Sequence, residues 1–167
     1  MGAGILPIAF YKGKIYFLLA REYIYAVDVT DGTPFKDAGK WSDFGGAKDN
    51  NETYIETAIR EGYEETDGFI GSKNDIKNMI NKSIYNVTKG GYKSYIVVIK
   101  YDNNLPKKFR DKFLSIKNNQ PHLIQKNGLY EKDMIKWFSY EDLKNSPKKM
   151  FRSWYYNHII KNLLKNF

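Results

Sequence analysis

The first part of the chain has the short, β-branched and aromatic runs of a sheet. Residues 3–11 and 15–21 are two such runs, separated by Lys12-Gly13-Lys14. A glycine-containing turn between two runs of this kind predicts a β-hairpin. Two further strands are predicted by similar runs that end in a polar turn or in glycine: residues 23–29 and residues 41–44.

The segment after the glycine pair Gly45-Gly46 has the period of a helix. Thr53 and Glu56 have the spacing of a capping box, in which each side chain accepts a hydrogen bond from the other residue's backbone amide. Small and apolar residues then recur on one side of the predicted helix: Ile55, Ala58, Ile59 and Gly62. We expect this side to pack on the sheet and Asp67-Gly68 to end the helix.

Helices and strands are interspersed over the rest of the chain. Lys89-Gly90-Gly91 predicts the turn of a second hairpin, between residues 83–88 and 92–101. Residues 134–138 predict a strand that leads into a turn and short helix at 140–143. Helices are also predicted at 76–80, 106–116 and 147–167, the last with Trp154, Ile159, Ile160, Leu163 and Leu164 for packing. Because strands and helices do not alternate regularly, a mixed-sheet α+β or α/β sandwich is favoured over a doubly wound fold.

Composition narrows the class of protein. The chain has 167 residues, 42% of them hydrophobic, and no repeat or linker, so we expect a single domain over residues 1–167. The absence of cysteine excludes disulfides, zinc–cysteine sites and a thiol nucleophile. With only His122 and His158, which have no recognisable partner, a metal would be bound by oxygen atoms. No apolar run approaches the about 20 residues of a membrane span, and the start lacks a signal-peptide pattern, so we expect a cytoplasmic protein with no membrane partner.

Three glutamates crowd one side of the helix that starts after Thr53. At about 100° per residue, Glu64 lies about 60° behind Glu61, and Glu65 lies about 40° ahead of it. Like charges this close destabilise a helix, by a few tenths of a kcal/mol per exposed pair. A hard cation reverses that effect, because Mg²⁺ is bound by such oxygen clusters together with substrate phosphates. From these residues alone, both a solvated helix face and a metal site remain open.

The spacing around these glutamates resembles the signature of the Nudix hydrolases. Gly46 is followed after five residues by Glu52, and after seven more by the run Arg60-Glu61-x-x-Glu64-Glu65. Farther along, Glu131 stands six residues before Trp137, as a loop glutamate often precedes a Trp-containing strand in that family. The resemblance implies an α/β/α sandwich around a mixed sheet.

Two positions depart from the Nudix pattern. Gly62 stands where an aliphatic residue is expected, and Asp67 stands where glycine is expected, with Gly68 one position later. A glycine in a helix interior costs about 1 kcal/mol relative to alanine, so we expect Gly62 to permit close packing. Neither departure removes a carboxylate.

The resemblance also implies roles for individual residues. Mg²⁺ or Mn²⁺ would be bound by the carbonyl of Gly45 and by the carboxylates of Glu61, Glu64 and Glu65. The catalytic set would be Glu61, Glu65, Glu131 and Arg60. Within it either Glu61 or Glu131 would be the base, and Arg60 would orient nearby carboxylates. Glu52 would support the loop that follows Gly46. The implied reaction is an in-line attack of water on phosphorus, which splits a nucleoside diphosphate linked to another moiety.

Two alternative functions are left open. One is removal of an mRNA 5′ cap, because residues 107–112 and 148–152 interleave cations with aromatic side chains that can bind RNA. The other is a non-catalytic module that only binds a nucleotide or RNA. However, the net charge of +8 also suits any polyphosphate, and Phe109 and Phe113 have the spacing of a core stripe. Trp41, Trp137 and Trp154 are likewise expected in the core.

Overall fold

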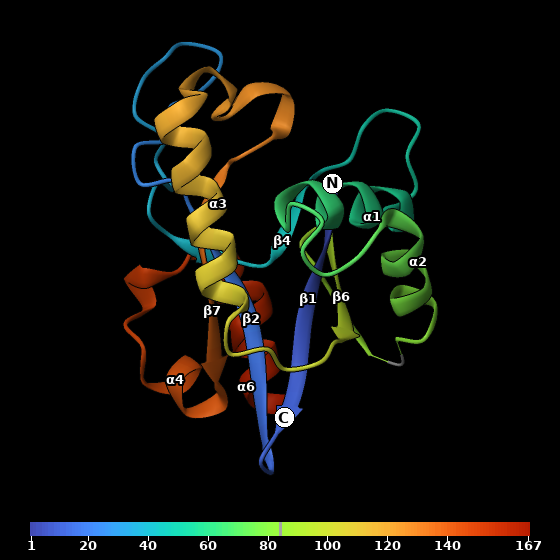
Figure 1. Ribbon diagram of the computed structural model, residues 1–167. Coiled ribbons are helices and arrows are strands. Elements are labelled where there is room, and N and C mark those ends of the chain that lie inside the picture. The colour runs from blue at the N-terminus through green and yellow to red at the C-terminus, as the bar shows by residue number, and fades with distance from the viewer. Residues whose placement is uncertain (84) are drawn as a thin grey trace.

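The computed structural model describes residues 1–83 and 85–167, and within them the strands form one seven-stranded mixed sheet (Figure 1). Its centre is β1 (Gly2–Tyr11), which is antiparallel to β2 (Lys14–Glu22) and parallel to β6 (Tyr92–Val98). The remaining strands pair with these three: β3 (Trp41–Ser42) and β7 (Lys132–Ser139) with β2, β4 (Phe44–Ala47) with β1, and β5 (Asn86–Lys89) with β6.

The two central strands separate as they leave their hairpin. β1 and β2 pair only from Ile8 opposite Phe17 to Tyr11 opposite Lys14. The first part of β1 pairs instead with β4, and the last part of β2 pairs with β3. Two short strands therefore fill the space between them, and the carboxylates of the candidate site gather at this end of the sheet.

Helices cover both faces of the sheet, so the expected α/β/α sandwich is confirmed. One face carries α1 (Tyr54–Glu65), α2 (Lys73–Asn81) and α3 (Leu105–Asn119), seen in front of the strands in Figure 1. The other face carries α4 (Tyr140–Asn145) and the C-terminal helices α5 (Ser153–Tyr155), η4 (Tyr156–Ile160) and α6 (Lys161–Asn166). Short 3₁₀ turns complete the helical segments: η1 (Pro121–Leu123), η2 (Lys126–Gly128) and η3 (Lys148–Met150).

Side chains of β1 alternate between the two cores, as expected for a strand covered on both faces. Ala3 and Ile5 belong to the core under α1, α2 and α3, together with Ala58. Leu6 belongs to the opposite core, together with Tyr155 of the C-terminal helices. The early hydrophobic run is therefore the central strand of the molecule.

Several predicted elements differ from the structure. Residues 23–29 are a loop with one isolated bridge between Val27 and Pro34, so the strand predicted there is wrong. Tyr25 and Val29 are exposed because no neighbouring strand covers them. The strand predicted at 41–44 is two strands, β3 and β4, and Gly45-Gly46 lies inside β4.

The other differences concern lengths. The strands predicted at 83–88 and 92–101 are shorter, and Ile84 lies outside the described residues. Helix α2 begins earlier than predicted because Ser72 and Asp75 form a second capping box. The helix predicted at 147–167 is interrupted at Phe151, which is extended and bridges to Trp41.

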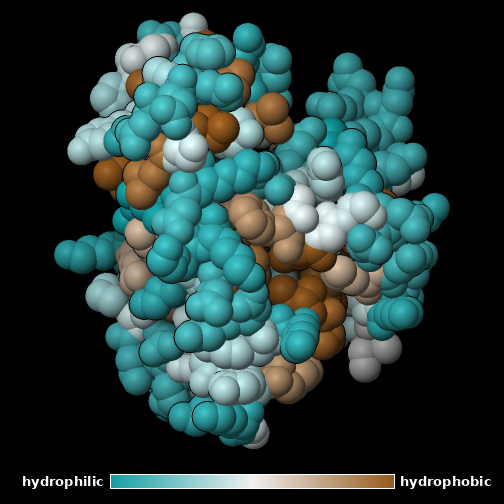
Figure 2. Space-filling view, in the orientation of Figure 1, coloured by the Kyte–Doolittle hydropathy of each residue, from teal (hydrophilic) through white to brown (hydrophobic). Residues whose placement is uncertain are grey.

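The surface beside α2 carries an apolar hollow far along β1 from the glycine pair. A cavity of about 630 Å³ is lined there by Ile8, Phe10, Met79 and Val98, among others. Figure 2 shows these hydrophobic residues gathered next to α2. Among the described residues, none of the helices is long and apolar enough to cross a membrane.

Candidate active site

Helix α1 is held at its start and along its packed side. The capping box predicted from the sequence is present, with the Glu56 amide donating to Thr53 Oγ1 at 3.2 Å. Close packing at Gly62 is also confirmed, because a Cβ there would lie 2.8 Å from Cδ1 of Ile5 in β1. Ile55 is exposed rather than packed, and Thr57 is buried in its place. The helix is thereby turned so that Glu65 points inward.

The glycine pair lets β4 approach both α1 and β1. The Gly45 amide donates to Glu65 Oε2 at 2.7 Å. A Cβ on Gly46 would lie 2.5 Å from Glu61 Oε1, so a side chain there would displace that carboxylate. Because Gly4 of β1 lies opposite Gly45, a Cβ on Gly45 would also meet the β1 backbone. Two glutamates of α1 therefore depend on the absence of side chains in β4.

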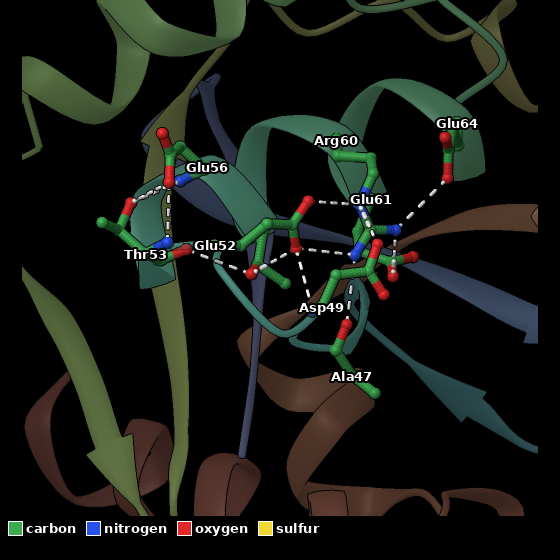
Figure 3. A network of polar contacts seen from close by, with 9 residues as sticks. Ala47, Asp49, Glu52, Thr53, Glu56, Arg60, Glu61 and Glu64 are labelled. Atoms are coloured by element: carbon green, nitrogen blue, oxygen red, sulfur yellow. Dashed lines mark hydrogen bonds and ion pairs between the residues drawn. The ribbon is translucent and has the colours of Figure 1, made fainter.

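Arg60 ties the loop before α1 to the helix, as Figure 3 shows. Its Nε donates to Glu52 Oε1 and its Nη1 to Glu61 Oε1, each at 2.7 Å. Its Nη2 donates to the carbonyl of Ala47 at 3.1 Å, and its Nη1 lies 3.6 Å from Glu64. The hydrogen bonds from Arg60 lower the pKa of Glu52 to about 2.

The predicted residues come together around one cavity of about 470 Å³, which we call the carboxylate cavity. It lies between β4, α1 and the loop before β7. Among its lining residues are Gly45, Gly46, Arg60, Glu61, Glu64, Glu65 and Glu131. Glu52 lies behind this wall and is linked to it by hydrogen bonds from Arg60 and from the Asp49 amide. Glu131, predicted only from its distance to Trp137, therefore faces the three glutamates of the helix.

Burial and mutual repulsion raise the pKa of three glutamates of this cavity, Glu61, Glu65 and Glu131. Burial raises the pKa of Glu61, and the charges of Glu64 and Glu131 raise it further, against the opposing effect of Arg60. Burial likewise raises the pKa of Glu131 and, well above its usual value, that of Glu65. Acids whose protonated form is favoured in this way are typical of functional sites.

The charged residues of the site that were not predicted from the sequence include Glu22, Lys132 and Arg152. Lys132 is buried and forms ion pairs with Glu22 and, at 3.3 Å, with Glu65. Arg152 lies 3.5 Å from Glu22 and lines the cavity. Glu22 and Lys132 are 110 positions apart and meet only because β2 pairs with β7. Pairing between distant strands leaves no local signal in the sequence.

The donor atoms of the cavity suit a hard divalent cation. Carboxylate oxygens are the ligands that Mg²⁺ and Mn²⁺ prefer. Cationic side chains hold some of these oxygens, as Arg60 does for Glu61 and Lys132 for Glu65. Over residues 1–83 and 85–167, no group of three or more His, Cys, Asp or Glu side chains is already arranged to hold a metal ion. The cavity therefore fits a cation by its chemistry, and binding requires these side chains to reorient.

The two basic segments use their aromatic side chains for packing. Phe109 and Phe113 of α3 are buried, as the core-stripe interpretation predicted, and Phe151 is buried as well. Trp41 and Trp137 are in the core as expected, whereas Trp154 is only half-buried. The aromatic rings expected to stack on RNA bases are therefore covered, and the exposed part of these segments is their lysines.

No protein-family model matches the sequence. A stretch of 65 residues is 43% identical to an uncharacterized protein, L534, of Acanthamoeba polyphaga mimivirus; it covers 38% of this chain and only 18% of the mimivirus protein.

Two solved structures are similar over nearly the whole chain. The Nudix hydrolase RenU of M. smegmatis has a TM-score of 0.52 at 13% identity, covering 99% of this chain and 84% of RenU. The Ap4A hydrolase of C. elegans, in a binary complex, also has a TM-score of 0.52, at 17% identity and with both chains fully covered. At this identity the likeness concerns the fold, and it agrees with the fold that the spacing from Gly46 to Glu65 implied. The chain therefore has the fold of the Nudix hydrolases.

Proposed function

We propose that this protein is a Mg²⁺- or Mn²⁺-dependent Nudix pyrophosphohydrolase that cleaves a phosphoanhydride in a nucleoside diphosphate linked to another moiety. The observation that carries the proposal is the convergence of Glu61, Glu64, Glu65 and Glu131 on one cavity. Such a group of carboxylates repels an anionic substrate unless a cation joins the two.

The cation would be held by the carboxylates of Glu61, Glu64 and Glu65 and by the Gly45 carbonyl. When bound, it neutralises diphosphate oxygens and acidifies a water molecule. The chain supplies the remaining functions. Arg60 holds Glu61 and Glu52 in place, and Arg152 offers a positive charge to the substrate on the far side of the cavity.

A substrate panel tests the function directly. Purified protein with Mg²⁺ is expected to release phosphate-containing products from at least one class among dinucleoside polyphosphates, nucleotide sugars, free nucleotides, inositol pyrophosphates and capped RNA. EDTA should abolish that release. Ligand binding that is independent of metal, with no product after long incubation, would support the non-catalytic binding module instead.

The base is tested by comparing two variants. If Glu131 is the base, Glu131→Gln should lower kcat by about 100-fold or more while Mg²⁺ binding survives. A base acts when deprotonated and burial raises the pKa of Glu131, so activity should rise as pH passes through that pKa. This rise should flatten in Glu131→Gln. An unchanged rate in Glu131→Gln would assign the base to Glu61 or another residue, and Glu61→Gln should lower kcat in either case because Glu61 is also a proposed metal ligand.

A further inference from the structure

A second chamber, of about 290 Å³, adjoins the carboxylate cavity. The two share the backbone of Gly45, Gly46 and Ala47 and the side chain of Arg152 as a common wall. The other walls of the second chamber come from the start of β1, the β3–β4 turn, the β5–β6 turn with Tyr92, and Trp154. The two cavities are therefore neighbours, separated by the glycine pair of β4 and by Arg152.

The lining of the second chamber suits a flat group of a ligand. Glycines at 45, 46, 90 and 91 contribute backbone and no side chain. Trp154 supplies a half-buried ring, and this ring packs edge-to-face on Tyr92 with the ring centroids 4.7 Å apart. Fixed aromatic rings bind nucleobases by stacking. The helix after Trp154 continues as a π-helix at Tyr156–Ile160, a rare form that is frequent at functional sites.

Polar groups are buried beside this ring. Asp43 lines the chamber and accepts hydrogen bonds from the hydroxyls of Tyr92 at 2.9 Å and Ser94 at 2.7 Å. The Tyr155 hydroxyl is buried without a hydrogen-bond partner among the described residues. A carboxylate oxygen accepts more than one hydrogen bond, so Asp43 retains capacity for an N–H group of a ligand.

Arg152 stands at the boundary of the two chambers. Its Nε donates to Asp37 at 3.1 Å and its Nη1 lies 3.5 Å from Glu22. A guanidinium has five N–H donors, so further donors remain for a phosphate. From these contacts, and resting on the proposed function, we propose that the second chamber binds the nucleobase half of the substrate. In this arrangement Trp154 stacks on the base and Arg152 holds the adjoining phosphate.

A binding experiment tests the base subsite without requiring hydrolysis. AMP, GMP and ribose 5-phosphate contain no phosphoanhydride, so their affinity for the full chain can be measured by calorimetry with Mg²⁺ present. The wild type should bind a nucleoside monophosphate more tightly than ribose 5-phosphate. Trp154→Leu should weaken nucleoside monophosphate binding by about 5- to 150-fold, the range for loss of one base–aromatic stack, and leave ribose 5-phosphate unchanged.

Trp154→Phe is the matched control, because it keeps an aromatic face and should retain most of the affinity. It also covers the case in which Trp154→Leu unfolds, which a thermal melt would reveal. Equal weakening of the nucleotide and the sugar phosphate would overturn the subsite. So would a wild type that does not prefer the nucleotide, or a Phe variant that folds but binds no better than the Leu variant.

Hydrolysis assays separate this proposal from the function on which it rests. With a nucleotide substrate, Trp154→Leu should raise KM and change kcat little; with an inositol pyrophosphate, which has no base, KM should stay the same. Equal effects on both substrates would overturn the subsite and leave the hydrolase standing. The opposite outcome is also distinguishable. If the wild type hydrolyses no substrate, but Trp154→Leu weakens the binding of AMP and not of ribose 5-phosphate, the hydrolase is overturned and the subsite stands.

Discussion

Glu65 is both a proposed metal ligand and a buried part of the fold. Its carboxylate is buried, accepts the Gly45 amide and lies beside Lys132, which Glu22 also contacts. Burial raises its pKa well above the usual value, so the folded protein disfavours its charged form despite the neighbouring lysine. A bound cation would favour the charged form, which agrees with the proposed role of Glu65 as a metal ligand.

Glu65→Gln is therefore expected to separate activity from stability. A neutral amide is a poor ligand for a hard cation, so kcat should fall by about 100-fold or more. Melting in EDTA should show equal or slightly higher stability, because a disfavoured buried charge is removed and Lys132 keeps Glu22 as a partner. A Glu65→Gln protein with full activity would break the link between this helix and a metal-bound diphosphate.

Lys132→Met is the matched control for that variant. It leaves the buried carboxylate of Glu65 without its cation and Glu22 with Arg152 at 3.5 Å, and breaking a buried pair in this way costs about 3–5 kcal/mol. The same melts should therefore show a large loss of stability. Adding Glu65→Gln to Lys132→Met should recover part of it.

The buried carboxyl group of Asp43 leads to a separate prediction, about how the stability of the fold depends on pH. Burial raises its pKa from 3.8 to about 6, against the opposing hydrogen bonds from Ser94 and Tyr92. The folded state thus holds this proton more tightly than the unfolded state, so stability falls as pH rises from about 4 to about 6. A shift of this size corresponds to about 3 kcal/mol. Asp43→Asn mimics the protonated form, and urea unfolding at several pH values should show a flatter dependence over that window. Parallel curves for the two proteins would contradict the shift.

At the scale of elements, the parts predictable from the sequence are those that depend on near neighbours. The α1 capping box involves residues three positions apart, and the Nudix spacing around it lies within one loop and one helix. The loop at 23–29 was predicted as a strand because its pattern suits a sheet, but its bridge between Val27 and Pro34 stays isolated from the sheet. The contacts of Glu22 with Lys132 and with Arg152 depend on the register and ends of distant strands. The acidic residues of the carboxylate cavity were therefore largely predictable from the sequence, whereas the positions of Lys132 and Arg152 beside them were not.

The contact between α1 and β1 yields a prediction about packing. Gly62→Ala gains helix propensity of about 1 kcal/mol, but the new Cβ would lie 2.8 Å from Ile5 Cδ1 in a filled core. Overpacking costs about 1–3 kcal/mol, so the variant should be less stable. In an Ile5→Val background, which lacks that Cδ1 atom, Gly62→Ala should be neutral or stabilising. Chemical denaturation of all four proteins gives the coupling energy, and additive effects would rule out the clash.

At the scale of the whole molecule, the site and the surface have opposite charge. Among the charged residues that line the carboxylate cavity acids predominate, whereas the chain carries a net charge of +8. The exposed lysines include Lys148 and Lys149, next to the segment that carries Arg152 and Trp154. A positive surface around an acidic cavity attracts polyphosphates from a distance, and the proposed metal would provide the local binding.

Ionic strength should separate this general attraction from specific recognition of RNA. For a small nucleotide substrate, salt should lower kcat/KM through slower encounter and leave kcat nearly unchanged. For capped RNA, lysine–phosphate contacts add an advantage over the free cap nucleotide at low salt, and this advantage should fall steeply as salt rises. Because Phe109, Phe113 and Phe151 are buried, stacking on these rings cannot preserve the advantage of RNA at physiological salt.

A double variant tests the lysines directly. Lys148→Ser combined with Lys149→Ser should reduce the low-salt advantage of RNA and leave turnover of the free nucleotide at saturation intact. A preference for capped RNA that persists at about 150 mM salt in this double variant would instead establish decapping as the function.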